Sequence, residues 1–91
     1  MRELKKGMLA KSKAGHDAGR LYVIMKADSE YVYLADGTLR TLERLKKKRR
    51  RHIQIIFQIP RSLKQLMEEN QELRDEHIKR AIKEYKNQQE V

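Results

Sequence analysis

The densest group of chemically active side chains is the run LKKKRRRH, in which residues 46–51 are three lysines followed by three arginines. The run begins after one β-prone segment and leads into another, so its backbone is constrained and its charges are clustered. Such a density of positive charge is repulsive unless a polyanion neutralises it, and phosphates do so with release of counterions. The run therefore predicts a nucleic-acid-binding surface. The competing interpretations are a solvated charge run without function and a nuclear-localisation tag.

The distribution of charge along the chain supports the same interpretation. The 91 residues carry a formal net charge of +9. Residues 1–59 contain 15 Lys and Arg against 6 Asp and Glu, whereas residues 60–91 contain 7 of each kind. A localised excess of this kind is the electrostatic footprint expected of a protein with a polyanionic partner.

Two tyrosines add a second kind of contact. Tyr31 and Tyr33 alternate with apolar residues, so both are expected on one face of a strand, together with Arg40. Aromatic rings on a cationic face stack on the bases of single-stranded or looped RNA. The alternative is that the two rings cover the margin of a small core or support a C-terminal helix.

No group of residues predicts catalysis or a metal site. His16, His52 and His77 are isolated in the sequence, and the chain has no cysteine to supply thiolate ligands. Asp17 and Asp36 lie in turn-rich segments, where aspartate is favoured by hydrogen bonds to the nearby backbone. The sequence has no glycine-rich phosphate-binding loop. We therefore expect a non-enzymatic protein with no cofactor, no metal and no small-molecule substrate.

Composition also restricts the environment of the protein. No apolar run approaches the roughly 20 residues of a membrane helix, and the first residues, MRELKKGMLA, lack the apolar centre of a signal peptide. A chain without cysteine suits a reducing compartment. We expect a cytoplasmic protein with no membrane association.

Short strands must position these side chains in the first two thirds of the chain. Residues 8–13, 20–26 and 52–59 are predicted strands, and residues 14–19 (AGHDAG) are a turn-rich loop. Strands of this length and spacing, with turns between them, suggest a small barrel, whose closure would remove exposed strand edges.

The segment YVYLADGTLRTL predicts a β-hairpin. Its central Asp36 and Gly37 supply the positive φ angles of a two-residue type I′ turn. That turn would place Leu34 opposite Leu39, and it would place Arg40 opposite the second tyrosine of the segment.

Residues 60–91 predict a helical extension. Pro60 ends the β part, and the four residues from Ser62 to Gln65 match a capping box. Apolar residues then recur at helical spacing with an interruption near residues 70–75, which predicts either two helices or one weakened helix. The second apolar stripe is expected to pack on the barrel, with a protein partner as the alternative.

Opposite charges recur four residues apart in the last predicted helix. Asp75 with Lys79 and Arg80 with Glu84 have the spacing of ion pairs on a helix surface. We expect these pairs to give the helix local support.

Residues 6–56 resemble the KOW-domain large-subunit ribosomal protein family fourteen-e of archaea and eukaryotes, and its bacterial KOW relatives. The resemblance lies in GMLAKSKAGHDAGRLYVIMK and YVYLADGTLRTLERLKKKRRRHIQII, and DEHIKRAIKEY resembles the segment after the barrel in that family. It implies an SH3-like β-barrel with a helical extension, which binds ribosomal or other structured RNA. By position it implies that Lys13, Gly15, Gly19 and Arg20 form the KOW loop, and that Arg40 and residues 46–48 form the basic segment.

Three positions depart from the family pattern. Tyr22 stands where the family has a glycine, Leu45 where it often has proline, and Arg74 where a Ser or Thr would cap the last helix.

The predicted architecture is mainly β with an α-helical C-terminus: a small SH3-like barrel over residues 1–59, then one or two helices over residues 60–91. The predicted function is non-catalytic binding of RNA, above all ribosomal RNA, with ribosomal or other translation proteins as further partners. The alternatives are a protein-interaction adaptor of the transcription or translation machinery and a general polyanion- or DNA-binding protein. The predicted RNA contacts are Lys11, Lys13, Gly15, His16, Gly19, Arg20, Arg40, Arg44, Lys46, Lys47, Lys48, Arg49, Arg50, Arg51 and His52, with Tyr31 and Tyr33 as stacking residues.

Overall fold

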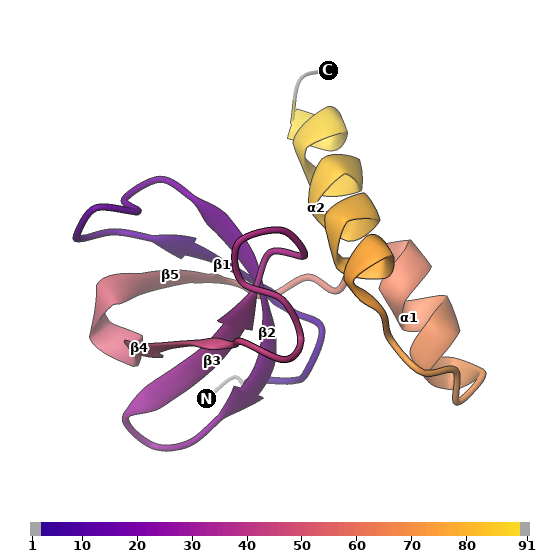
Figure 1. Cartoon of the computed structure of the whole chain (residues 1–91), viewed down its shortest axis with the longest axis horizontal. Coiled ribbons are helices and arrows are strands. Elements are labelled where there is room, and N and C mark those ends of the chain that lie inside the picture. The colour runs from indigo at the N-terminus through magenta and orange to yellow at the C-terminus, as the bar shows by residue number, and fades with distance from the viewer. Residues whose placement is uncertain (1–2, 90–91) are drawn as a thin grey trace.

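Five short strands form one antiparallel sheet, and two helices follow it (Figure 1). The structure, a computed structural model, describes residues 3–89. The strands β4 and β5 are joined by a single 3₁₀ turn, η1, and they are the two edges of a sheet with the order β4-β3-β2-β1-β5, which is not closed. The elements are β1 (Leu9–Ser12), β2 (Leu21–Ala27), β3 (Tyr31–Ala35), β4 (Lys46–Arg49), η1 (Arg50–His52), β5 (Ile53–Ile56), α1 (Arg61–Glu68) and α2 (Asp75–Gln89). The prediction of a mainly β fold with an α-helical C-terminus is confirmed.

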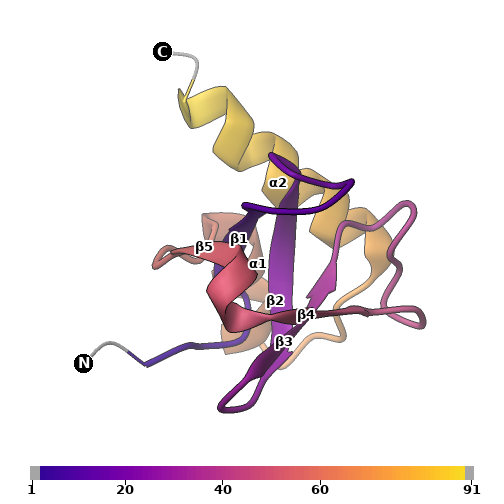
Figure 2. The same cartoon turned by 90° about the vertical axis from the view of Figure 1, so that its left-hand side faces the viewer.

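Both faces of the sheet bury apolar side chains, because alternate residues of each strand point to opposite sides. On one face, Ile24 and Leu34 belong to a cluster formed by the strands themselves. On the other face, Val23 packs in a cluster with Leu63 of α1 and Ile78 of α2. The two helices therefore lie against one face of the sheet, as the two perpendicular views show (Figures 1 and 2).

The C-terminal extension contains two helices, as one of the two alternatives predicted. Asn70 follows α1 with a φ of 56°, the left-handed conformation that commonly ends a helix. The apolar stripe of α2 is buried, with Ile78 and Ala81 fully covered and Ile82 8% exposed. This stripe packs on the protein itself, as expected, and is not available to a partner.

The predicted capping box at Ser62 is wrong. The helix α1 begins at Arg61, and its N-cap residue is Pro60, which has no side-chain oxygen to accept a hydrogen bond. The Ser62 hydroxyl instead donates to Glu84 Oε2 at 2.8 Å. A tertiary contact that ties α1 to α2 replaces the local one.

The predicted hairpin at Asp36 and Gly37 is also wrong. The outer neighbour of β3 is β4, with Leu34 opposite Lys46, and not the segment that directly follows the turn. One carboxylate oxygen of Asp36 accepts the backbone N–H groups of Thr38 at 2.9 Å and Arg40 at 2.8 Å, which curls the chain into a loop. Leu39, the predicted partner of Leu34, is 69% exposed in that loop.

Candidate nucleic-acid interface

The basic run forms a strand of its own, the edge strand β4, followed by the turn η1. Its side chains alternate, so that Lys46 and Lys48 are half-buried on one side while Lys47 and Arg49 are exposed on the other. The cationic run is thereby divided into two sets with different surroundings.

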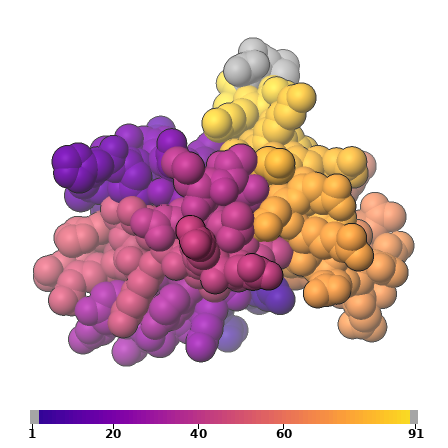
Figure 3. Space-filling view, in the orientation of Figure 1, coloured from indigo at the N-terminus to yellow at the C-terminus, as the bar shows by residue number. Residues whose placement is uncertain are grey.

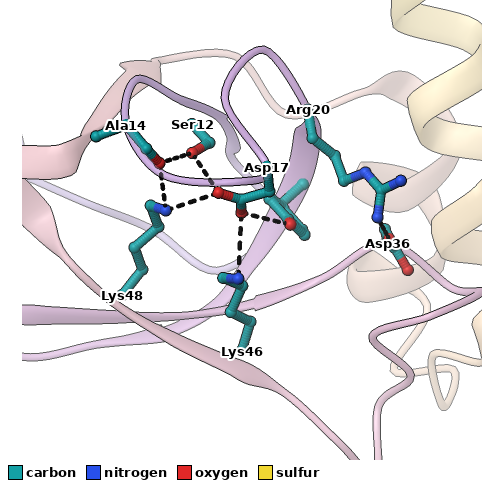
Figure 4. Close-up of polar contacts among 8 residues, drawn as sticks. Ser12, Ala14, Asp17, Arg20, Asp36, Lys46 and Lys48 are labelled. Carbon is teal, nitrogen blue, oxygen red and sulfur yellow. Dashed lines mark hydrogen bonds and ion pairs between the residues drawn. The ribbon is translucent and has the colours of Figure 1, made fainter.

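The half-buried set meets a single carboxylate, Asp17, in the loop between β1 and β2 (Figure 4). Lys48 Nζ lies 2.8 Å from Asp17 Oδ1 and also donates to the Ala14 carbonyl oxygen at 2.9 Å. Lys46 Nζ lies 3.4 Å from Asp17 Oδ2. The side chain of Lys48 is only 11% exposed and that of Asp17 only 10%, so their charges balance within the protein.

Two hydroxyl groups complete the surroundings of Asp17. Ser12 Oγ donates to Oδ1 at 2.9 Å, and the Tyr22 hydroxyl donates to Oδ2 at 2.7 Å. Burial acts to raise the pKa of Asp17, but the hydrogen bonds from Lys48, Tyr22, Ser12 and Lys46 outweigh it and hold that pKa well below its usual range. Burial and the hydrogen bond to Asp17 raise the pKa of Tyr22 to about 12. The carboxylate therefore stays ionised, and it fixes the loop to β4.

Asp17 is the residue of this site that sequence reasoning missed. Its position in a turn-rich segment indicates only a turn aspartate, and nothing in its neighbours marks it otherwise. Its ionic partners, Lys46 and Lys48, stand 29 and 31 positions later in the chain. Only the pairing of β3 with β4 brings them together.

The exposed set faces two aromatic rings, and we call Lys26, Tyr31, Tyr33, Lys47 and Arg49 together the β3–β4 face. Lys47 Nζ lies 4.2 Å from the centre of the Tyr31 ring, and Arg49 Cζ lies 5.2 Å from it. Lys26 Nζ lies 5.6 Å from the centre of the Tyr33 ring. A cation and the face of an aromatic ring attract each other electrostatically. This arrangement holds positive charge and half-buried aromatic surface side by side.

The predicted partnership of the tyrosines with Arg40 is wrong. Arg40 lies in the loop between β3 and β4, where its carbonyl oxygen accepts the N–H groups of Asp36 at 2.9 Å and Gly37 at 3.1 Å. Lys47 and Arg49 take the predicted place beside the rings, because β4 and not the loop pairs with β3.

The residues of η1 are partly structural. The Arg50 backbone N–H donates to the Glu30 carbonyl oxygen at 2.8 Å, and its guanidinium donates to the Asp28 carbonyl oxygen at 3.0 Å. The His52 carbonyl oxygen accepts the N–H of Lys13 at 2.8 Å, which fixes the start of the β1–β2 loop. Arg51 is exposed and, among residues 3–89, takes part in no ion pair within 4.0 Å. Of these residues, Arg51 has the most freedom to meet a partner.

The β1–β2 loop presents further predicted residues at the surface. Lys13, Gly15, His16, Gly19 and Arg20 are all exposed, as are Lys11 on β1 and Arg40 and Arg44 in the β3–β4 loop. The Arg20 side chain is 46% exposed, and its Nη1 lies 3.7 Å from Asp36 Oδ2. Burial acts to raise the pKa of Asp36, but hydrogen bonds from Arg40 and Thr38 and the charge of Arg20 lower it. The loop thus has two sides, with Asp17 turned to β4 and Arg20 turned to Asp36 (Figure 4).

The described part of the chain also bears on other classes of site. Among residues 3–89, no three His, Asp or Glu side chains gather where they could hold a metal ion. No helix within the same residues is long and apolar enough to cross a bilayer. A comparison with protein-family models finds no match, and a comparison with curated proteins finds no relative.

Proposed function

We propose that the protein is a non-catalytic RNA-binding protein that contacts RNA through the β3–β4 face, Arg51 and the β1–β2 loop. The observation that carries this proposal is the alternation within β4. It turns Lys46 and Lys48 toward Asp17, whose single negative charge balances one of the two lysines, and it leaves Lys47 and Arg49 exposed around Tyr31. Cations position a phosphate backbone, and aromatic rings stack on bases, so this face suits RNA with unpaired bases.

The sheet supports an SH3-like barrel as part of the proposal. The support is that the two edge strands of the open sheet, β4 and β5, are joined by only the three residues of η1, which brings one end of each edge close to the other. On the KOW-domain resemblance we further propose ribosomal RNA as the target and a cytoplasmic, ribosome-associated role. The adaptor alternative is weakened, because the apolar stripe of α2 is already buried on the sheet.

The first experiment is a salt titration of binding to a large-subunit ribosomal RNA fragment, with duplex DNA as competitor. We expect RNA to be preferred, and we expect the triple variant K47Q/R49Q/R51Q to lower the slope of log affinity against log salt by about two, since each phosphate contact contributes roughly 0.7–0.9. The matched control is K5Q/R61Q/K64Q, which removes three exposed cations that do not belong to the β3–β4 face. An unchanged slope in the first triple variant would refute the proposed surface, and equal binding of duplex DNA would refute the preference for RNA.

Tyr31 gives a separate prediction about bases. We expect Tyr31→Leu to weaken binding of single-stranded RNA by about 1–3 kcal/mol, the range measured when a stacking ring is removed. Binding of duplex RNA should be unchanged, because its bases are already stacked. Phe57→Leu is the control, since Phe57 is an exposed ring outside the β3–β4 face. Equal losses on single-stranded and duplex RNA would show that Tyr31 supports the fold and does not stack on bases.

A further inference from the structure

A second cationic surface lies between α2 and the two loops that approach it. A groove of approximately 500 Å³ is lined by Arg20, Asp36, Lys79, Lys83 and Lys86 among other residues. A neighbouring hollow of approximately 420 Å³ shares Lys86 with it and adds Lys11. We call the two together the α2 groove. In Figure 3 the magenta loop after β3 lies directly against the orange part of the helix.

The three lysines of the groove form one stripe along α2. Lys79, Lys83 and Lys86 are separated by four and three residues, which places them on the same side of a helix. The stripe lies beside the buried Ile78 and Ile82, so the packing of α2 on the sheet directs it toward the β1–β2 loop. The position of these charges is therefore set by the fold.

The lysines of this stripe are not neutralised by the acidic residues of α2. The predicted pairing of Asp75 with Lys79 is wrong, because Asp75 Oδ1 accepts the backbone N–H of Leu42 at 2.8 Å. Glu84 accepts the hydroxyl of Ser62, a residue of α1. Within residues 3–89, none of the three lysines has an ion-pair partner within 4.0 Å.

Asp36, the one carboxylate that residues 3–89 contribute to the groove lining, is also engaged. Asp36 accepts two backbone N–H groups and the Thr38 hydroxyl, and its second oxygen lies 3.7 Å from Arg20 Nη1. Its side chain is 8% exposed, so little of its charge reaches the groove surface. The described lining of the groove thus contains five cationic side chains and one buried carboxylate that is already hydrogen-bonded.

The β1–β2 loop contacts both β4 and the lining of this groove. Asp17 of the loop pairs with Lys46 and Lys48 of β4, and Arg20 of the same loop reaches Asp36 in the groove (Figure 4). The loop therefore connects the groove to the strand whose other side carries the β3–β4 face.

We propose that the α2 groove binds a second stretch of the phosphate backbone of the RNA that occupies the β3–β4 face. This inference rests on the proposed function. Phosphate is the ligand that fits, because lysine ammonium groups act as point charges toward phosphate oxygens and release counterions on binding. Most of the lining cations are lysines, which meet phosphate oxygens as point charges, so we propose that this contact positions the RNA along its backbone.

The test uses the full chain and the same large-subunit ribosomal RNA fragment. The variant K79Q/K83Q/K86Q should lower the salt slope by about two, because each phosphate that a lysine neutralises adds roughly 0.7–0.9 to that slope. The charge-preserving variant K79R/K83R/K86R should keep the slope of the original protein. K5Q/R61Q/K64Q again controls for loss of net charge, and circular dichroism with a thermal melt verifies that each variant is folded.

The outcomes separate this inference from the proposed function. If K79Q/K83Q/K86Q keeps the original slope while K47Q/R49Q/R51Q lowers it, the groove does not bind RNA and the β3–β4 face does. If only the α2 variant lowers the slope, the groove binds and the β3–β4 face is the wrong site. If the unaltered protein does not bind the RNA, or if the control triple variant lowers the slope equally, both proposals fail.

Discussion

Asp17→Asn is expected to destabilise the fold by about 3–5 kcal/mol near neutral pH, the range found when one partner of a buried ion pair is removed. The substitution would leave Lys48, whose side chain is 11% exposed, without its counter-charge 2.8 Å away. It would also weaken the acceptor for Ser12 and Tyr22. Since the same carboxylate joins the β1–β2 loop to β4, the loop should loosen as well.

The effect of Asp17→Asn should depend on pH in a defined direction. The pKa of Asp17 is lowered in the folded protein, whereas in the unfolded chain it is about 4. A group of this kind contributes stability that is fully present above the unfolded pKa and is lost as pH falls toward the folded pKa. The difference between the original protein and the variant should therefore be constant from about pH 5 to 8 and shrink below about pH 4.

Urea unfolding at several pH values measures this difference. Asp28→Asn is the matched control, because Asp28 is exposed and its carboxylate accepts the nearby backbone N–H groups of Glu30 and Tyr31. Its loss should change stability far less. If the two variants were equally stable at pH 7, or if the deficit of Asp17→Asn were as large at pH 2 as at pH 7, the network around Asp17 would not act as described.

Ionisation of Tyr22 should lower the stability of the protein at alkaline pH. Its pKa is raised to about 12 in the folded protein, compared with about 10 when it is unfolded. The stability that it contributes is present below the unfolded pKa and is lost as pH rises from about 10 toward about 12. Tyr22→Phe should remove that part of the alkaline decline in the same urea series.

Gly37→Ala is the second large expected effect, a loss of about 2–4 kcal/mol in the free energy of unfolding. Gly37 has a φ of +83°, which disfavours any side chain. A Cβ there would also lie 2.6 Å from the Asp75 carbonyl oxygen and 3.1 Å from the Lys79 backbone nitrogen. Backbone of α2 cannot yield as a flexible side chain would, so the loop and the helix must separate.

Gly19→Ala distinguishes the two causes. Gly19 has a similar φ of +89°, but a Cβ built there meets nothing within 4 Å. Its loss of stability should be limited to the backbone conformation, about 1–2 kcal/mol. Urea unfolding midpoints compare the two variants directly. Equal losses would show that the close approach of α2 at Gly37 does not contribute.

The strands and helices were largely predictable because local composition determines them. β-branched and aromatic residues marked β2, β3 and β5, although β5 ends at Ile56, three residues before the predicted end. The break between α1 and α2 was visible as an interruption of the apolar period near Asn70. These features depend on neighbours within one or two turns of chain.

The errors share a physical cause, which is competition between local and distant partners. Asp36 and Gly37 have the composition of a hairpin turn, but the Asp36 carboxylate bonds two nearby backbone N–H groups and forms a wider loop. Ser62 has the spacing of a cap, but Glu84 takes its hydroxyl. Local sequence patterns identify a side chain that can form a hydrogen bond, but its partner depends on the tertiary structure.

The positive charge of the site was predictable, but the division of the basic run into a paired side and an exposed side was not. The run of six cations is evident in the sequence, and its alternation in a strand predicts two sides that are both cationic. On one side the structure pairs both lysines with Asp17, which balances one of their two charges and which no local pattern identifies. The basic stripe on α2 could not be predicted, because Asp75 has the sequence spacing of an ion-pair partner of Lys79. In the structure Asp75 accepts the backbone N–H of Leu42 instead, so it does not pair with Lys79, which stays at the surface.

The edge position of β4 also affects how the protein stays dispersed in solution. Along its outer side, backbone N–H and C=O groups face no further strand of residues 3–89, and such an edge can template pairing with a second copy. Lysine and arginine side chains along an edge oppose that pairing, because two copies would bring like charges together. The cations proposed to bind RNA therefore also oppose edge-to-edge aggregation of the free protein. The same side chains of β4 would then serve both solubility and RNA affinity. When RNA is bound, it would itself block the strand from pairing with a second copy.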